Sequence, residues 1–118
     1  MPDWSIKIVP VTGKPGVFAT FTPDIDKSKP GQPLKVVQGD LVSWNNTTDT
    51  EHWPWPVASA TAPPVDPPPG GNTLVGNIQP HTPSSAYNVV STAGTTIFYC
   101  CKWHPEERGQ MVVVEFGQ

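Results

Sequence analysis

The distribution of proline is the feature that most restricts how this chain can fold. The 118 residues include 16 prolines and 10 glycines, and prolines occur in every third of the chain. Proline lacks a backbone N–H and clashes with the preceding helical turn, so the chain favours short strands joined by turns over helices. Runs of β-branched and aromatic residues lie between the expected turns, as strands require. We therefore expect an all-β fold.

About seven or eight such runs occur, which predicts a Greek-key β-sandwich. Residues 5–9 alternate apolar and polar side chains and end at Pro10, a pattern that suits an edge strand. Val42, Trp44 and Asn46 share one face of another strand, and we expect Trp44 in the core. Residues 23–33 read as a polar loop. The remaining expected strands cover residues 17–21, 34–37, 41–45, 73–78, 85–90, 96–99 and 111–114.

The segment at about 53–72 is rich in proline, and this composition excludes a central strand or a helix. A linker here would place the reactive side chains of residues 49–56 and 100–109 in different domains. Neither half would then have enough residues for a core. We therefore expect a single domain over residues 1–118, with this segment as a long loop folded over the end of the sandwich.

Residues 100–109 combine the reactive side chains of the chain. Cys100 and Cys101 stand at the end of an apolar run, and His104 follows three residues after Cys101. A thiolate and an imidazole on one loop can bind a soft transition metal, but they leave at least one position to be filled from elsewhere. His52 is the candidate for that third ligand, because it lies in the other chemically loaded segment, residues 49–56.

These residues carry a resemblance to a known family. Residues 101–105 read Cys-Lys-Trp-His-Pro before a valine-rich run, and residues 39–46 read Gly-Asp-Leu-Val-Ser-Trp-Asn-Asn. The two motifs, in this order, are similar to those of the cupredoxins, the small blue-copper electron-transfer proteins that include plastocyanin, amicyanin and azurin. The resemblance runs from about residue 34 to residue 116. It implies copper, as Cu(I) and Cu(II), bound by His52, Cys101 and His104.

Two ligand positions stay open. Counting from Gly94 in the family's strand arrives at Cys100, whereas counting back from His104 arrives at Cys101. We favour Cys101, because coordination geometry fixes the spacing of the loop, whereas a strand absorbs an extra residue as a bulge.

The axial ligand is the second open position. The family usually has a methionine before the loop glycine, and Glu107 stands there in this chain. Glu107, Glu106, Met111 and no protein ligand are the alternatives.

A thiolate with two imidazoles and a weak axial group is the donor set of blue-copper sites. The resemblance therefore implies an electron carrier with a type 1-like copper site, not an enzyme. Its redox partners would dock on an apolar patch near Trp53, Trp55 and Trp103. A copper-handling or red-copper-like protein with an open or carboxylate axial position is the alternative. An interaction domain that is metal-free or binds zinc is a third possibility.

Charge and hydropathy exclude other classes. The formal net charge is −3 and no basic run is present, which argues against nucleic acid as a partner. No apolar stretch is long enough to span a membrane. The resemblance implies a periplasmic or otherwise extracytoplasmic protein, with its leader absent from this sequence because no basic and then apolar segment follows Met1. We expect a monomer.

Overall fold

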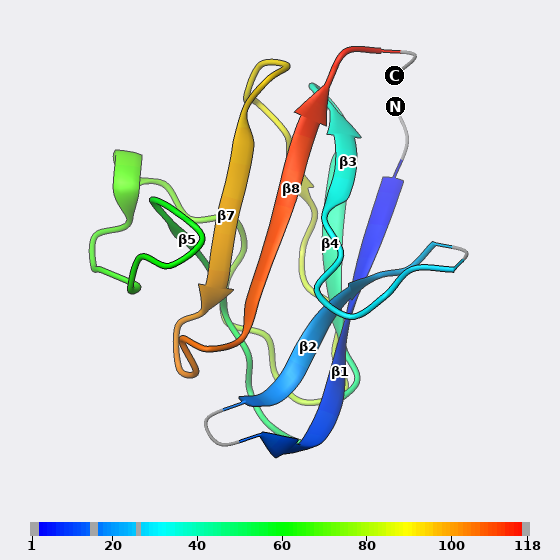
Figure 1. Ribbon diagram of the computed structural model, residues 1–118, viewed down its shortest axis with the longest axis vertical. Coiled ribbons are helices and arrows are strands. Elements are labelled where there is room, and N and C mark those ends of the chain that lie inside the picture. The colour runs from blue at the N-terminus through cyan, green and yellow to red at the C-terminus, as the bar shows by residue number, and fades with distance from the viewer. Residues whose placement is uncertain (1–2, 15–16, 26, 117–118) are drawn as a thin grey trace.

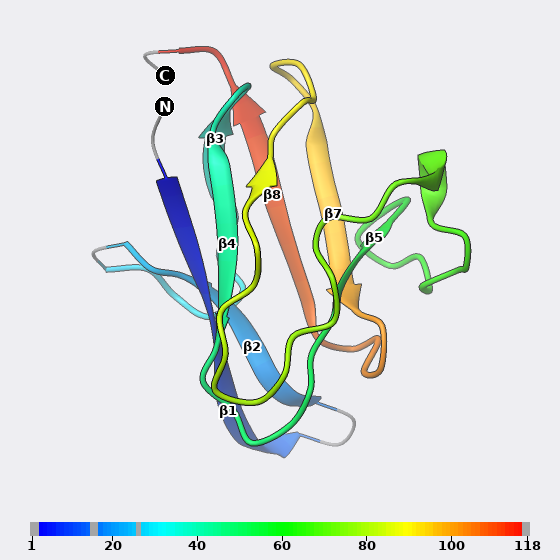
Figure 2. The same cartoon turned by 180° about the vertical axis from the view of Figure 1, so that it is seen from behind.

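The computed structural model describes residues 3–14, 17–25 and 27–116, which form a sandwich of two four-stranded sheets (Figure 1, Figure 2). The strand orders are β2-β1-β4-β6 and β3-β8-β7-β5. The strands are β1 (Asp3–Lys14), β2 (Val17–Pro23), β3 (Leu34–Val37), β4 (Leu41–Asn46), β5 (Pro54–Val57), β6 (Tyr87–Asn88), β7 (Thr96–Cys101) and β8 (Arg108–Val114). In these described ranges the one helical segment is a 3-10 turn, η1 (Pro69–Gly71). The predicted all-β sandwich is confirmed.

The described residues contain no helix that is long and apolar enough to cross a membrane.

The first strand is central and not at an edge, so this part of the prediction is wrong. β1 pairs with β2 on one side and with β4 on the other. It also continues past Pro10, where the sequence suggested an end. The pairing with β4 stops at Ile8, so Pro10 lies where β2 is its one neighbouring strand. A proline is tolerated there because its missing N–H interrupts no second ladder.

The proline-rich segment contains a strand that the sequence did not predict. Residues 54–57 form β5, which pairs antiparallel with β7 and brings Pro54 opposite Cys101. β5 lies at the edge of its sheet, the position where prolines fit a ladder. The rest of the segment loops outward beside β7 (Figure 1). Residues 54–57 are therefore a strand where the sequence predicted a loop.

Of two other predicted strands, one is absent and one is shorter than expected. Residues 73–78 form no strand, and Ile78 makes an isolated bridge with His52. Of residues 85–90, Tyr87–Asn88 alone is a strand. Val75, Ile78 and Val89 are nevertheless buried. Their apolar character therefore indicated burial correctly but not regular pairing.

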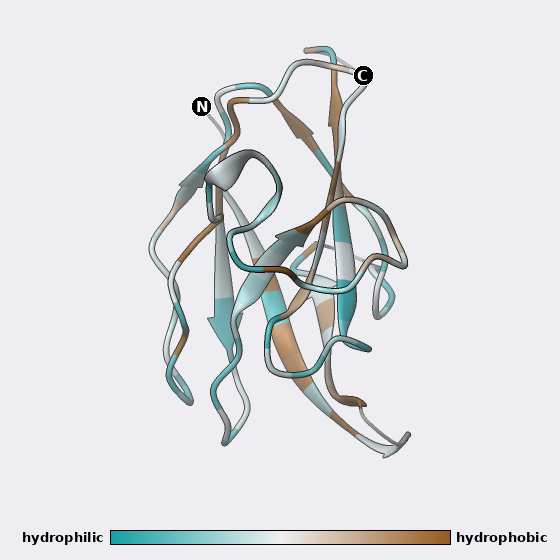
Figure 3. Cartoon of the chain, turned by 90° about the vertical axis from the view of Figure 1, so that its left-hand side faces the viewer, coloured by the Kyte–Doolittle hydropathy of each residue, from teal (hydrophilic) through white to brown (hydrophobic). Residues whose placement is uncertain are grey.

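The core lies between the two sheets, and Figure 3 shows hydrophobic residues mainly along the strands. Val42, Trp44 and Asn46 are all buried on one face of β4, as predicted. The Trp44 ring packs edge-on against Tyr99 of β7, with centroids 5.4 Å apart. The Phe21 ring of β2 packs against the Tyr99 ring, with centroids 4.9 Å apart. These contacts join the two sheets.

Tyr99 needs a glycine opposite it. Its backbone pairs with Gly109 in the β7–β8 hairpin, and its ring lies across that residue. A Cβ atom on Gly109 would lie 2.4 Å from Tyr99 Cζ, too close for van der Waals contact.

We expect Gly109→Ala to lower the free energy of unfolding by about 1–3 kcal/mol, because the new methyl group displaces the Tyr99 ring from its packed position. Urea unfolding measures the loss. Gly76→Ala is the matched control, since a Cβ there meets nothing within 4 Å. Its effect should stay within about 0.5 kcal/mol. Equal losses in the two variants would contradict the packing argument.

Candidate metal centre

Four side chains from separate parts of the chain meet at one end of the sandwich. They are His52, Cys101, His104 and Glu107, and one donor atom from each lies within 4.8 Å of the others. Cys101 ends β7, His104 and Glu107 lie in the turn before β8, and His52 lies between β4 and β5. Three of the four are buried and His104 is partly exposed. The structure therefore brings together residues that the sequence proposed as ligands.

Hydrogen bonds within the turn fix the spacing of its three donor residues. His104 N donates to Cys101 O at 3.2 Å, and Glu107 N donates to His104 O at 2.9 Å. Cys101 N donates back to Glu107 O at 3.0 Å. The turn is thus held by its own backbone, and Cys101 Sγ lies 3.8 Å from His104 Nδ1.

His52 is held from both sides. Its backbone exchanges two hydrogen bonds with Ile78, at 3.1 and 2.9 Å. Its Nε2 lies 3.1 Å from Thr50 Oγ1. This contact occupies one ring nitrogen and directs Nδ1 toward the cluster, as the outer partners of metal-binding imidazoles do.

Glu107 is fixed by strand β2 of the opposite sheet. Its Oε2 accepts hydrogen bonds from Phe18 N at 2.8 Å and Ala19 N at 3.0 Å. The other oxygen, Oε1, lies 3.1 Å from His52 Nδ1 and 3.5 Å from His104 Nδ1. One oxygen therefore anchors the carboxylate and the other faces the two imidazoles.

Two polar atoms in the cluster have no hydrogen-bond partner. They are His52 Nδ1 and Glu107 Oε1, both fully buried. They are close to each other but not aligned for a hydrogen bond, although unpaired buried polar atoms are costly. Two ligands of one ion would have this relationship, so the residues fit a metal.

Cys101, not Cys100, belongs to the cluster. Neighbouring residues of a strand point to opposite faces, and Cys100 lies opposite Trp55 and Arg108. Cys100 therefore faces away from the donor cluster, which includes Cys101. Burial raises the pKa of Cys100 to about 11, with Arg108 opposing the shift.

Met111 lies away from the cluster. It is buried in the core opposite Leu34 and Ile97, and Ile97 lies four residues before Cys101 on β7. That separation is about 13 Å along a strand, beyond the reach of a methionine side chain. Glu106 is exposed on the turn. Of the proposed axial residues, Glu107 is the one that lies among the other donors.

The cluster perturbs the ionisation of its members. Burial lowers the pKa of His52, but the adjacent Cys101 and Glu107 side chains favour the protonated ring, outweigh that effect and raise the pKa to about 9. Burial alone would raise the pKa of Glu107. The nearby His52, the Phe18 amide and His104 lower it by more than burial raises it, so that the pKa falls below its ordinary value. The metal-free cluster therefore keeps a proton on His52 at neutral pH, which a bound cation would displace.

Aromatic side chains surround the exposed side of the site. The Phe18 ring lies 4.7 Å from the His104 ring. Lys102 Nζ lies over the rings of Trp53, Trp55 and Trp103, at 4.8, 4.1 and 5.6 Å. The sequence alone did not point to Thr50, Phe18 or Lys102. Thr50 lies two residues before His52, but nothing in the sequence links Phe18 to His104.

No protein-family model and no curated protein matches the sequence. Among solved structures, the chain is similar to a purple cupredoxin from Nitrosopumilus maritimus, with a TM-score of 0.54 and 15% identity over 92% of this chain and 97% of that one. The chain has the cupredoxin fold. A methionine-to-alanine mutant of amicyanin with Cu(I) also matches, with a TM-score of 0.48 and 28% identity over 75% of this chain and 76% of that one.

The cupredoxin resemblance predicted from the two motifs is thus confirmed in the fold. The donor set agrees with it, because a thiolate, two imidazoles and a carboxylate oxygen could hold a copper ion.

The raised pKa of His52 predicts how the stability of the metal-free protein depends on pH. Because the folded protein binds the His52 proton more tightly than the unfolded chain, this stabilisation is complete below about pH 6.5 and is lost as pH rises to about 9. Urea unfolding with a chelator, repeated across that range, should show the free energy of unfolding falling with pH. His52→Gln should lack this component; a variant that keeps the full slope would show that another group causes it.

Proposed function

We propose that this protein is an electron carrier that binds one copper ion through His52, Cys101, His104 and Glu107. The support is the convergence of the four donor atoms, two of which are buried and unpaired. A copper ion bound there supplies one-electron chemistry between Cu(I) and Cu(II). The protein supplies the donors, their spacing and a dry environment.

The support for an electron carrier, and not an enzyme, is how firmly the donors are held. The turn carries three internal backbone hydrogen bonds, and Glu107 and His52 are each fixed by further partners. Donors that keep their positions need little rearrangement when the charge at the site changes. Electron exchange then has a low reorganisation cost, by the same preorganisation that favours other electrostatic sites.

His104 is the proposed contact with the redox partner. It is the one partly exposed member of the cluster, and a surface hollow of about 400 Å³ lies beside it. Thr50, Glu51, Trp103 and His104 line this hollow. The docking patch would include Trp103, which is 49% exposed, and the partly buried Trp53. Trp55 is 3% exposed, so it supports the patch from beneath and does not form its surface.

We also propose a monomer that works outside the cytoplasm, in keeping with the family resemblance. The support for this location is the family resemblance of the motifs at residues 39–46 and 101–105.

The position of Glu107 favours one second candidate, a copper-handling or red-copper-like protein with a carboxylate axial ligand. A carboxylate is harder and more negative than the family's usual thioether, so it stabilises Cu(II) over Cu(I). The two candidates share the ligands and differ in the reduction potential and the spectrum of the copper.

Copper titration of the reduced metal-free protein tests the thiolate ligand. We expect one equivalent of Cu(II) to give an intense thiolate-to-copper absorption band in the parent and in Cys100→Ser. Cys101→Ser should lack the band, because its oxygen cannot replace the soft sulfur donor. Electron paramagnetic resonance of the same samples gives the hyperfine splitting. A band that survives in Cys101→Ser and disappears in Cys100→Ser would reverse the assignment.

The axial carboxylate has a matched control in its neighbour. Glu107→Gln removes a charge from the cluster, whereas Glu106→Gln removes the same charge from an exposed position on the same turn. We expect Glu107→Gln to raise the reduction potential and shift the visible spectrum, and Glu106→Gln to change neither appreciably. Potentiometry on both copper-loaded variants measures the difference. A Glu107→Gln protein with the parent's spectrum and potential would exclude the carboxylate as a ligand.

A further inference from the structure

The hollow beside His104 has one acidic residue in its lining, Glu51, next to the exposed ring of Trp103. None of the ion pairs formed by the described residues includes Glu51. Its two side-chain hydrogen bonds both use Oε1, so the second carboxylate oxygen is left for a ligand. The hollow therefore offers a negative charge and an aromatic ring side by side.

A hydrogen-bond network fixes this wall of the hollow. Asn77 Nδ2 donates to Glu51 Oε1 at 2.7 Å, and Gln79 Nε2 donates to the same oxygen at 2.9 Å. The other end of the Asn77 amide accepts a hydrogen bond from Trp103 Nε1 at 3.1 Å. One amide thus ties the carboxylate to the indole. Side chains that are already ordered lose less conformational entropy on binding, so the wall is preorganised for a ligand.

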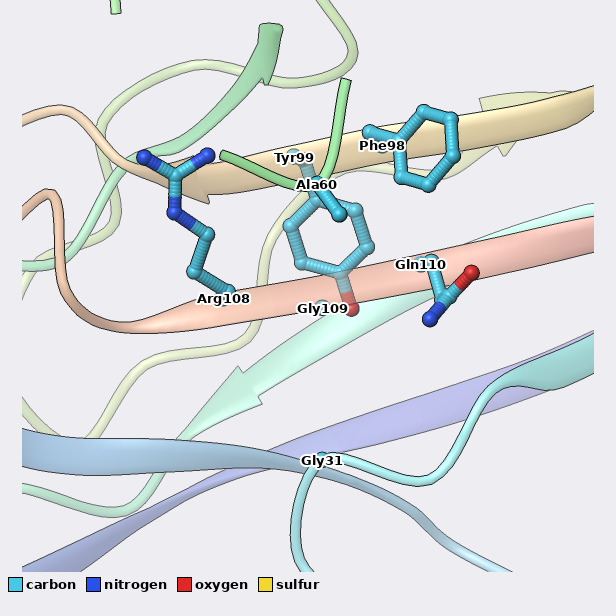
Figure 4. Close-up of a pocket in the computed structure, with 7 residues that line it drawn as sticks. All are labelled: Gly31, Ala60, Phe98, Tyr99, Arg108, Gly109 and Gln110. Atoms are coloured by element: carbon cyan, nitrogen blue, oxygen red, sulfur yellow. The ribbon is translucent and has the colours of Figure 1, made fainter. Parts of the chain in front are cut away.

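The lysine and the arginine of the ligand turn do not neutralise the hollow. Lys102 Nζ lies 4.1 Å from the centroid of the Trp55 ring and 3.4 Å from Asp66 Oδ2, so its charge is already compensated. Arg108 lies beside a separate cavity that Tyr99 also lines, and Figure 4 shows it extending from β8 there. Neither residue lines the hollow, which therefore keeps its negative charge.

We propose that the redox partner inserts a lysine or arginine side chain into this hollow, beside the Glu51 carboxylate and the Trp103 ring. A cation is attracted by a carboxylate and by the π-system of an indole. The aliphatic part of such a side chain can pack on the apolar surface of the ring. A volume of about 400 Å³ admits a whole side chain. The inference rests on the proposed function, because it assumes that the partner exchanges electrons with this protein.

The position of the hollow explains what such a contact would do. His104, the proposed contact with the partner, lines the same hollow. An exposed ion pair adds little affinity, but complementary charge raises the association rate and fixes the orientation of the two proteins. The basic side chain would therefore direct the redox group of the partner toward His104.

Nuclear magnetic resonance titration at constant ionic strength tests the cation with two probes of similar shape. Nα-acetyl-arginine amide carries the guanidinium, and Nα-acetyl-citrulline amide replaces it with a neutral urea. We expect the arginine probe to give saturable shifts of the Trp103 indole N–H and Asn77 side-chain amide signals. The citrulline probe should bind about threefold more weakly or worse, because it lacks the charge. Equal binding of the two probes, or no saturable shift with the arginine probe, would overturn the proposal.

Variants of the hollow make the test specific. Glu51→Gln removes the charge but keeps an oxygen that can accept the hydrogen bonds from Asn77 and Gln79. We expect it to bind the arginine probe about threefold more weakly, and Trp103→Leu to show a similar loss. Glu115→Gln removes an equal charge from an exposed position after β8 and should bind as the parent does. Parent-like binding by Glu51→Gln, or an equal loss in Glu115→Gln, would overturn the proposal.

The titration uses the metal-free protein, so its result does not depend on copper. A normal thiolate-to-copper band together with a failed arginine titration would overturn the basic side chain and leave the electron carrier. A failed copper titration would overturn the electron carrier, and with it the redox partner, even if the arginine probe binds.

Discussion

The Glu107 carboxylate is the interaction on which the arrangement of the donor cluster depends. One oxygen accepts two amide hydrogen bonds from β2, in the first sheet, and the other faces His52 and His104. The residue itself belongs to the turn between β7 and β8, in the second sheet. The two amide hydrogen bonds to Oε2 offset part of the cost of burying the carboxylate, so docking of β2 stabilises this form of the turn. Site formation and sheet packing are thereby coupled.

Local pattern explains what the sequence could predict. The β7–β8 hairpin, the face shared by Val42 and Trp44, and the spacing of Cys101 and His104 are each encoded within a few residues. The hairpin and the shared face are confirmed, because strand period is a short-range property. The Cys101 and His104 side chains lie close together, and their role as ligands stays a prediction. The prediction of His52 as a ligand depended on the family motif as well, since a single histidine in a sequence is weak evidence for metal binding.

Long-range pairing explains what the sequence could not predict. The hydrogen bond from Phe18 N to Glu107 Oε2 joins residues 89 positions apart, and no sequence pattern near either residue predicts it. The central place of β1 depends on its parallel pairing with β4, which the alternation within β1 does not reveal. Proline composition excluded a central strand near residues 54–57, but it did not exclude the edge strand that forms there.

The three tryptophans near the cluster illustrate the same limit. The sequence grouped Trp53, Trp55 and Trp103 as one apolar patch, whereas the structure arranges them around Lys102. Cation–π contacts of this kind contribute about 0.5–2 kcal/mol each. Lys102 N also donates to Trp53 O at 2.9 Å. These contacts of Lys102 connect the turn after β7 to the proline-rich segment. The exposed part of this tryptophan group, chiefly Trp103, is what a partner could contact.

Charge balance connects the proposed ligand set with its redox preference. A thiolate and a carboxylate together carry two negative charges, so a divalent ion makes the buried cluster neutral and a monovalent ion leaves it negative. Burial disfavours net charge, and the low exposure of His52, Cys101 and Glu107 makes this effect strong. With a neutral thioether in place of Glu107 the balance would reverse, and the monovalent ion would give the neutral site. In the proposed site, the residue at position 107 would therefore decide which oxidation state gives a neutral cluster.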